Sequence, residues 1–97
     1  MEKKENFPDE DHKRLFEAIL KLNSRAEAAS FFRDLLTIGE LDEFANRFKM
    51  AWLVDEGKSY QEIAHEVGCS TATVTRVAHW LRHGMGGYQL ALKRLKT

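Results

Sequence analysis

The sequence of 97 residues has little cysteine, little proline and no long apolar run. A single cysteine, Cys69, excludes an internal disulfide and is typical of a reducing compartment. No apolar stretch approaches the roughly 18 residues of a membrane-spanning helix, and the N-terminal residues lack the apolar core of a signal peptide. The composition therefore predicts a cytoplasmic protein with no membrane partner, and signals for strands are nearly absent.

Acidic residues are scarce only in the C-terminal part. Residues 1–57 contain 9 Lys/Arg and 13 Asp/Glu, a balance of −4, whereas residues 58–97 contain 6 Lys/Arg and 2 Asp/Glu, a balance of +4. Three of the four histidines also belong to the basic part. Such segregation favours a polyanionic partner at one end of the molecule. A chance division of charges over a solvated surface would give the same numbers.

Helix-start signals recur along the whole chain and predict an all-α protein. Ser24, Thr37 and Ser59 are each followed by Glu three residues later, the pattern of a capping box. Pro8 suits a first helical position, and acidic residues follow it. The predicted helices span residues 8–22, 25–36, 38–56, 60–67 and 71–82, with a short last helix that begins at about Tyr88. A chain of this length is expected to form one domain, residues 1–97.

The predicted helix over residues 38–56 is apolar on most of its surface. One stripe at helical spacing contains Ile38, Leu41, Phe44, Ala45, Phe48 and Trp52, and Met50, Ala51, Leu53 and Val54 widen it. Such a helix must be buried on several sides. Because a short chain supplies few helices to cover it, the pattern favours a homodimer. The alternative is a central helix covered within one chain.

Residues 59–82 have the spacing of a helix-turn-helix. Gly68 stands where a tight turn between helices needs a positive φ, and Ala64 provides the small residue where two helices cross. Val74, Val77 and Leu81 supply apolar anchors on the second helix. An ordinary helical hairpin is the alternative structure, but this combination favours the DNA-binding motif.

The outer face of the second helix of this motif suits double-stranded DNA. Small hydroxyl and methyl side chains allow close approach to base edges, and Arg76 suits a phosphate or a guanine. The predicted contacts with DNA are Lys58, Gln61, Ser70, Thr71, Ala72, Thr73, Thr75, Arg76 and His79. We therefore expect a DNA-binding regulator of transcription. A helix-turn-helix that docks on another protein of the transcription machinery is the alternative class.

Other chemistry has weak support in the sequence. His79 and His83 are four residues apart, but no third ligand has suitable spacing for a metal. Glycine-rich phosphate loops and Ser-His-Asp patterns are absent. The sequence therefore predicts neither an enzyme nor a metal site.

Two stretches, residues 36–48 and 68–76, resemble the Trp repressor. Almost the whole chain resembles the YerC/YecD branch of Trp-repressor-like proteins, with marks at residues 22–24, Phe31-Phe32, residues 70–73 and residues 84–88. The resemblance implies a six-helix fold, an intertwined homodimer and transcriptional regulation, with repression as the expected mode.

The same resemblance implies a ligand pocket formed by Thr37, Arg47, Arg76 and Trp80. The first three match the residues of the Trp repressor that hold L-tryptophan, whereas Trp80 falls where the repressor has a serine. Arg76 and Trp80 are four residues apart, so their side chains are expected to stack. We expect the Trp80 indole to fill or block the pocket. No cofactor is then needed, and L-tryptophan or another small effector is the less favoured possibility.

Overall fold

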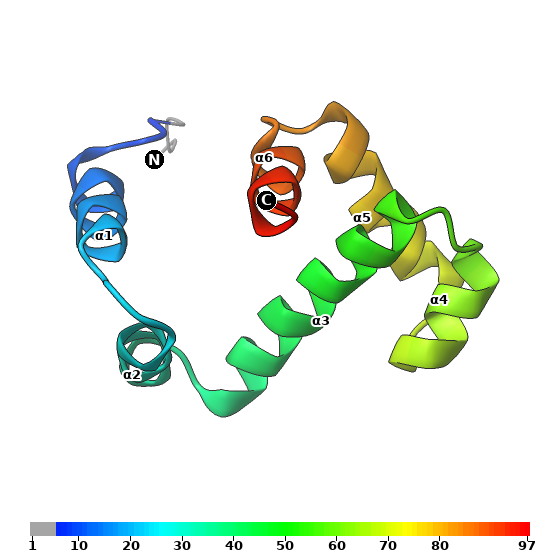
Figure 1. The fold of residues 1–97 in the computed structure, drawn as a ribbon, viewed down its shortest axis with the longest axis horizontal. Coiled ribbons are helices and arrows are strands. Elements are labelled where there is room, and N and C mark those ends of the chain that lie inside the picture. The colour runs from blue at the N-terminus through cyan, green and yellow to red at the C-terminus, as the bar shows by residue number, and fades with distance from the viewer. Residues whose placement is uncertain (1–5) are drawn as a thin grey trace, which may run out of the picture. The chain divides into compact units, whose positions relative to one another are not determined.

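The structure is a computed structural model that describes residues 6–97. Within these residues the regular elements are all helices: α1 (Glu10–Leu20), α2 (Arg25–Leu35), α3 (Ile38–Asp55), α4 (Tyr60–Val67), α5 (Thr71–His83) and α6 (Gly87–Leu95), as Figure 1 shows. The predicted all-α, six-helix fold is confirmed. None of these helices is long and apolar enough to cross a membrane.

The described residues form two compact units, residues 6–38 and residues 39–97. The first unit contains α1 and α2, and the second contains α4, α5, α6 and nearly all of α3. The predicted single domain over residues 1–97 stays a prediction, and its residues 1–5 lie outside the described residues.

The first helix begins after Pro8, so the prediction that this proline is the first helical residue is wrong. Asp9 is the N-cap of α1, and its carboxylate accepts a hydrogen bond of 2.9 Å from the His12 amide. The Nδ1 atom of His12 accepts the Asp9 amide in return, at 3.0 Å. This reciprocal pair satisfies two backbone N–H groups that the helix leaves free, which fixes the helix start at Asp9.

Serine caps begin α2 and α4. Ser59 and Glu62 form the predicted capping box at the start of α4, with both hydrogen bonds at 3.1 Å. At the start of α2, Ser24 accepts the Glu27 amide as predicted, whereas the Glu27 carboxylate accepts the Asn23 amide, one residue earlier than expected. These local bonds explain why the starts of both helices could be read from the sequence.

Two glycines with positive φ end α3 and α4. Gly57 has φ 91°, and the amides of Gly57 and Lys58 donate to the carbonyls of Val54 and Leu53. Gly68 has φ 84° and donates to the Ala64 carbonyl. Both positions lie in the left-handed region that glycine adopts without a steric cost. The predicted turn between α4 and α5 therefore forms where expected.

The hydrophobic core belongs to the second unit. It joins the second half of α3 to α4, α5 and one residue of α6, and consists of Met50, Ala51, Leu53, Val54, Ile63, Ala64, Val74, Val77, Ala78, Leu81 and Leu92. Ile63 on α4 and Val74 on α5 are completely buried. The predicted anchors of the helix-turn-helix thus pack as expected, and they fix α5 against α4.

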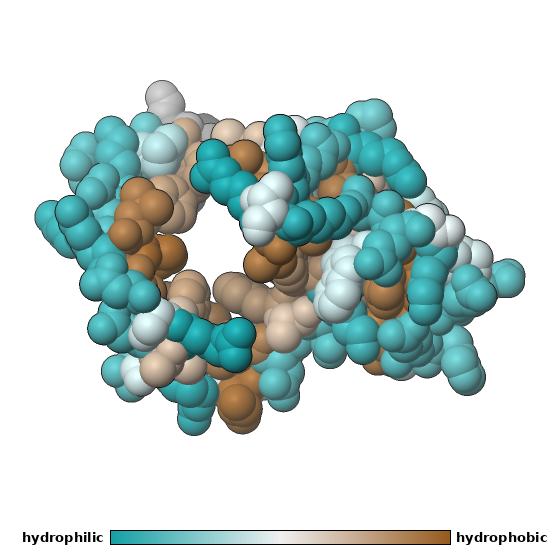
Figure 2. All heavy atoms as spheres, in the orientation of Figure 1, coloured by the Kyte–Doolittle hydropathy of each residue, from teal (hydrophilic) through white to brown (hydrophobic). Residues whose placement is uncertain are grey.

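Apolar side chains of α1, α2 and part of α3 reach the surface of the single chain. Neither α1 nor α2 contains a buried residue, and Leu20 is 75% exposed. Phe44 and Trp52 on α3 are 47% and 45% exposed. Helical spacing predicts that Ala28, Phe31, Phe32, Leu35 and Leu36 form the buried side of the second helix, but in one chain by itself Leu35 is exposed and the other four are only partly buried. Figure 2 shows apolar residues, in brown, among the hydrophilic surface.

Candidate nucleic-acid interface and adjoining pocket

The helix-turn-helix presents one side of α5 to solvent. Val74, Val77 and Leu81 are buried, whereas Thr75, Arg76, His79 and several neighbours are exposed. No acidic residue lies on α5, and its last turn carries Arg82 and His83. An exposed helix of small, hydroxyl and basic side chains without carboxylates is compatible with the phosphates and base edges of a DNA groove.

The predicted DNA contacts lie on the start of α4, on the turn and on α5. Eight of them are exposed: Lys58, Gln61, Ser70, Thr71, Ala72, Thr75, Arg76 and His79. Thr73 differs from the others because it is partly buried and lines a pocket behind α5.

Ser70 and Thr73 shape the first turn of α5. Ser70 is the N-cap and accepts the Thr73 amide at 3.2 Å, and the two hydroxyls lie 3.1 Å apart. The Thr75 hydroxyl donates to the Thr71 carbonyl at 2.9 Å. The serine cap satisfies a backbone N–H of the helix, and the Thr75 hydroxyl keeps its lone pairs for an outside donor. Local bonds therefore order the threonines of this turn before any ligand arrives.

Lys58 has a carboxylate partner that the sequence did not predict. The Glu66 carboxylate on α4 lies 3.4 Å from its Nζ and 3.6 Å from the Nζ of Lys49 on α3. Glu66 is partly exposed, so these ion pairs are screened by solvent. They nevertheless place a carboxylate beside the cation that was predicted to contact the DNA backbone.

The second half of α5 carries a row of aromatic rings. The centroids of His79 and His83 lie 5.1 Å apart, and those of His79 and Trp80 lie 5.3 Å apart in an edge-to-face arrangement. Residues 6–97 contain no group of three His, Cys, Asp or Glu residues suited to a metal ion. The histidine pair therefore lies on the exposed face of α5 without a third ligand.

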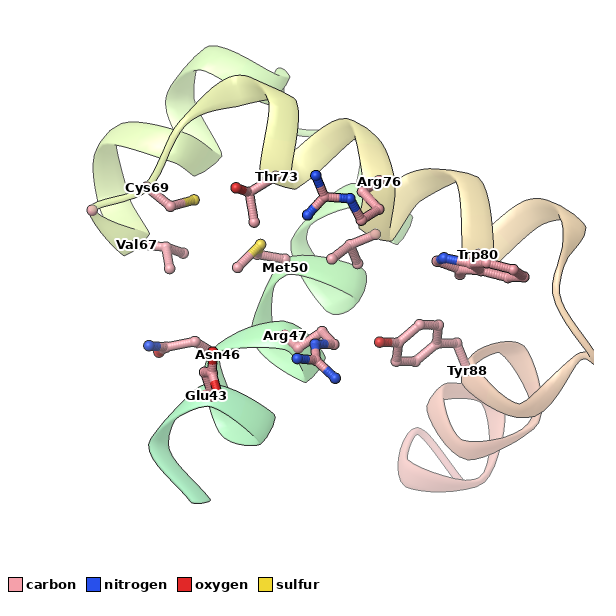
Figure 3. Close-up of a pocket in the computed structure, with 12 residues that line it drawn as sticks. Glu43, Asn46, Arg47, Met50, Val67, Cys69, Thr73, Arg76, Trp80 and Tyr88 are labelled. Carbon is pink, nitrogen blue, oxygen red and sulfur yellow. The ribbon is translucent and has the colours of Figure 1, made fainter. Parts of the chain in front are cut away.

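A pocket of about 540 Å³ lies behind α5, within the second unit. Figure 3 shows Arg76 and Trp80 of α5 across this space from Arg47 of α3 and Tyr88 of α6. The remaining lining residues are Glu43, Asn46, Met50, Val67, Gly68, Cys69, Thr73 and Val77. Two guanidinium groups, one carboxylate and two aromatic rings thus surround a volume in the range of small-molecule sites.

Trp80 forms part of the wall of this pocket in the single chain. Its side chain is 56% exposed, and the space beside it remains open. The predicted stacking of Arg76 on Trp80 is not among the cation–π contacts of the described residues, where Arg47 lies over the Phe44 ring at 5.7 Å. The expectation that the indole fills or blocks the site of an amino-acid ligand stays a prediction.

Three of the four residues predicted for the ligand pocket come together. Arg47, Arg76 and Trp80 line it, whereas Thr37 belongs to the first unit and its part in the pocket stays a prediction. The sequence reasoning missed Tyr88, which enters from α6 after the glycine-containing turn. No local pattern could have found it, because its position depends on how α6 packs against α5.

These features define the class of protein: an all-helical chain with a helix-turn-helix whose second helix is exposed, free of acidic residues and backed by a pocket. The profile of the Trp repressor protein family matches residues 10–96. The chain belongs to the Trp repressor family. Its membership supports DNA-binding regulation of transcription.

Relatives of the chain agree with this assignment. The chain is 43% identical over 82 residues to YerC, an uncharacterized protein of Bacillus subtilis (strain 168), and the match covers 84% of this chain and 79% of YerC. The crystal structure of a TrpR-like protein of Eubacterium eligens has a TM-score of 0.86 at 38% identity, over 93% of both chains. The crystal structure of a Staphylococcus aureus protein proposed to be a Trp repressor has a TM-score of 0.81 at 38% identity, over 87% of this chain and 84% of that chain.

Proposed function

We propose that this protein is a sequence-specific, DNA-binding transcriptional regulator that acts as a homodimer and represses by occupying its site. The observation that carries this proposal is the exposed face of α5. Thr75, Arg76 and His79 lie on this face, and the helix contains no acidic residue. Base edges in the major groove offer acceptors and thymine methyls to such side chains. Family membership and the basic C-terminal part of the chain support the same function.

The homodimer is supported by the apolar surface that the single chain leaves exposed. A groove of about 340 Å³ between α3 and α6 is lined by Phe48, Trp52, Leu92 and Leu95, and Leu95 is 70% exposed. The apolar residues of α1 and α2 have no buried position within the chain. Apolar side chains gathered on an exposed surface are typical of an interface. In a symmetric dimer, each copy would cover such surfaces of the other.

A dimer also gives the recognition helices their geometry. Two helix-turn-helix motifs related by a two-fold axis read half-sites about 34 Å apart, one turn of the duplex. The operator is then expected to be a palindrome with that spacing between the centres of its halves.

L-Tryptophan is not required as a corepressor in this proposal. The crossing of α4 and α5 is held by completely buried side chains of the protein, Ile63 and Val74, and the first turn of α5 is capped by Ser70. Contacts within the protein therefore hold the recognition helix α5 against α4, and no ligand is needed for this. The Trp80 indole on the rim also changes the pocket from the serine-containing form of the Trp repressor.

Selection of binding sites from a random duplex pool tests the proposal. Wild-type protein should enrich a palindromic site, with or without added amino acids. Arg76→Ala should lose this enrichment, whereas the matched control Arg94→Ala on α6 should retain it, because Arg94 lies outside the helix-turn-helix. Binding to a partner protein of the transcription machinery, with no salt-dependent binding to any duplex, would instead establish the protein-interaction alternative.

A further inference from the structure

An inter-helix pair at the edge of the helix-turn-helix has no part in the function proposed so far. The Nη1 atom of Arg82, near the end of α5, donates a hydrogen bond of 2.8 Å to the Tyr60 hydroxyl, on the first residue of α4. Tyr60 is partly buried and packs against the core, whereas Arg82 is exposed. One end of this pair is therefore fixed by the fold, and the other faces solvent.

The pair holds Arg82 in place without neutralising it. A phenol is a neutral acceptor, so the guanidinium keeps its full charge and most of its donors. Three lysines of the second unit are paired with carboxylates: Lys49 and Lys58 share Glu66, and Lys96 contacts Asp55. The ion pairs found among residues 6–97 do not include Arg82. Arg82 thus combines a fixed position with an available charge.

The position of Arg82 on α5 points to the DNA backbone. Residues seven apart lie on nearly the same side of a helix, and Arg82 is seven residues after Thr75, an exposed residue of the recognition face. The hydrogen bond to Tyr60 shows that this side borders the start of α4. In a helix-turn-helix the first helix crosses the sugar–phosphate backbone while the second enters the groove. A cation at that border is next to a phosphate.

We propose that Arg82, positioned by Tyr60, binds a phosphate of the DNA backbone. The guanidinium fork matches two phosphate oxygens. The Tyr60 hydroxyl, which accepts from Arg82, keeps its own proton as a further donor to the same phosphate. The contact carries no sequence information and adds to the affinity for every duplex. This inference rests on the proposed function, because it needs the helix-turn-helix to bind DNA.

The salt dependence of binding measures this contact directly. Full-length protein and its variants are titrated, over a range of salt concentrations, with the selected operator and with a random-sequence duplex. Arg82→Gln should weaken binding to both duplexes by on the order of tenfold at low salt. It should also reduce the slope of log K against log salt by about 0.9, the value of one lost phosphate contact. The control Arg94→Gln should change neither quantity.

Two further variants separate charge from position. Arg82→Lys keeps the charge and should retain the slope while losing part of the affinity, because a lysine lacks the planar fork. Tyr60→Phe removes the acceptor that orients Arg82, and it should likewise lower affinity with little change of slope. A role of Arg82 in stability alone would lower the denaturation midpoint of the free protein and leave the slope of Arg82→Gln at the wild-type value.

The outcomes distinguish this inference from the function on which it rests. If wild type binds and Arg76→Ala abolishes operator recognition, but Arg82→Gln keeps the wild-type slope, the phosphate contact is wrong and the proposed function stands. If wild type shows no salt-dependent binding to any duplex, both are wrong. A slope reduced only on the operator, and not on the random duplex, also contradicts a backbone contact.

Discussion

At the scale of single residues, the glycine that ends α5 is the one of the five glycines compared at which a Cβ atom would meet other atoms within 4 Å. A Cβ atom on Gly84 would lie 2.5 Å from the Trp80 carbonyl oxygen, in the backbone of α5. The Gly84 amide also donates to that same oxygen at 2.9 Å. Because the neighbour is backbone and not the end of a flexible side chain, α5 itself must shift to admit a larger residue.

Gly84→Ala should therefore lower the free energy of unfolding by about 1–3 kcal/mol. Urea denaturation followed by circular dichroism measures the change. Gly87→Ala is the matched control, because a Cβ there meets no atom within 4 Å and Gly87 lies at the start of α6. That control should be neutral or stabilising by up to about 1 kcal/mol. Equal midpoints for the two variants would contradict the clash.

We propose that Trp80 limits which ligands the pocket behind α5 accepts. Its indole lines the rim, with a guanidinium of Arg47 or Arg76 on each side of the space. We expect wild type to bind L-tryptophan no more tightly than millimolar. A free tryptophan must lose translational and rotational freedom on binding, whereas the Trp80 indole is already part of the chain. Trp80→Ser should enlarge the pocket and increase affinity for indoles. Isothermal titration calorimetry measures both affinities. Micromolar binding of L-tryptophan to wild type would contradict the proposed role of Trp80.

At the scale of helices, the sequence predicts what depends on local bonds. The start of α4 follows from Ser59 and Glu62, and the turn after it from Gly68, because each interaction joins residues only a few positions apart. The buried faces of α4 and α5 follow from the spacing of Ile63, Val74 and similar residues. The helix-turn-helix can therefore be predicted from the sequence alone.

Contacts between helices could not be predicted in the same way. Arg82 meets Tyr60 across 22 residues, and Tyr88 reaches the pocket from α6. The carboxylate beside Lys58 comes from Glu66, in the last turn of α4. These partners are set by crossing angles and rotamers, which no periodicity of the sequence records. This is why the site residues on α5 were found and the side chains that orient or neutralise them were not.

The carboxylate of Glu66 should restrain DNA binding through the helix pair that it bridges. Glu66→Gln removes the partner of Lys49 and Lys58 and leaves both charges available to phosphate. Affinity for a random duplex should rise, and the slope of log K against log salt should steepen by up to about 0.9 for each lysine that gains a phosphate. Stability should fall by at most about 1 kcal/mol, since the pairs are partly exposed.

Asp42→Asn is the matched control for Glu66→Gln, because it removes the same charge from an exposed position on α3 outside the helix-turn-helix. Fluorescence anisotropy with a labelled duplex compares the two variants. Equal gains would show that net charge alone governs the effect, and a loss of affinity for Glu66→Gln would contradict the proposed restraint.

At the scale of the whole molecule, α6 ties the basic C-terminal end to the long helix. The Lys96 ammonium lies 2.8 Å from Asp55 on α3. The hydrogen bond to this carboxylate, followed by its charge, raises the pKa of Lys96 above its ordinary value. The contact is therefore present at neutral pH, and on the alkaline side its contribution to stability is lost as the pH rises through that raised pKa. The ion pair lies at the edge of the groove between α3 and α6, which Lys96 also lines.

This groove is where we expect folding and the proposed assembly to depend on the same residues. Phe48 lines it and packs against the core, with its ring centroid 6.3 Å from that of Tyr88. Trp52 lines the same groove and remains 45% exposed. Because Phe48 belongs both to the core of the chain and to the surface proposed for a second copy, its loss should affect folding and association together.

Phe48→Asp should therefore unfold the protein and not merely yield folded monomers, because it places a carboxylate without a partner among apolar side chains. Phe48→Leu, which keeps an apolar side chain, should remain folded and dimeric with reduced stability. Sedimentation velocity gives the assembly state and circular dichroism the helix content of the same samples. For wild type, we expect a dimer whose denaturation midpoint rises with protein concentration, since folding and association are one equilibrium. A folded wild-type monomer with a midpoint independent of concentration would refute the homodimer.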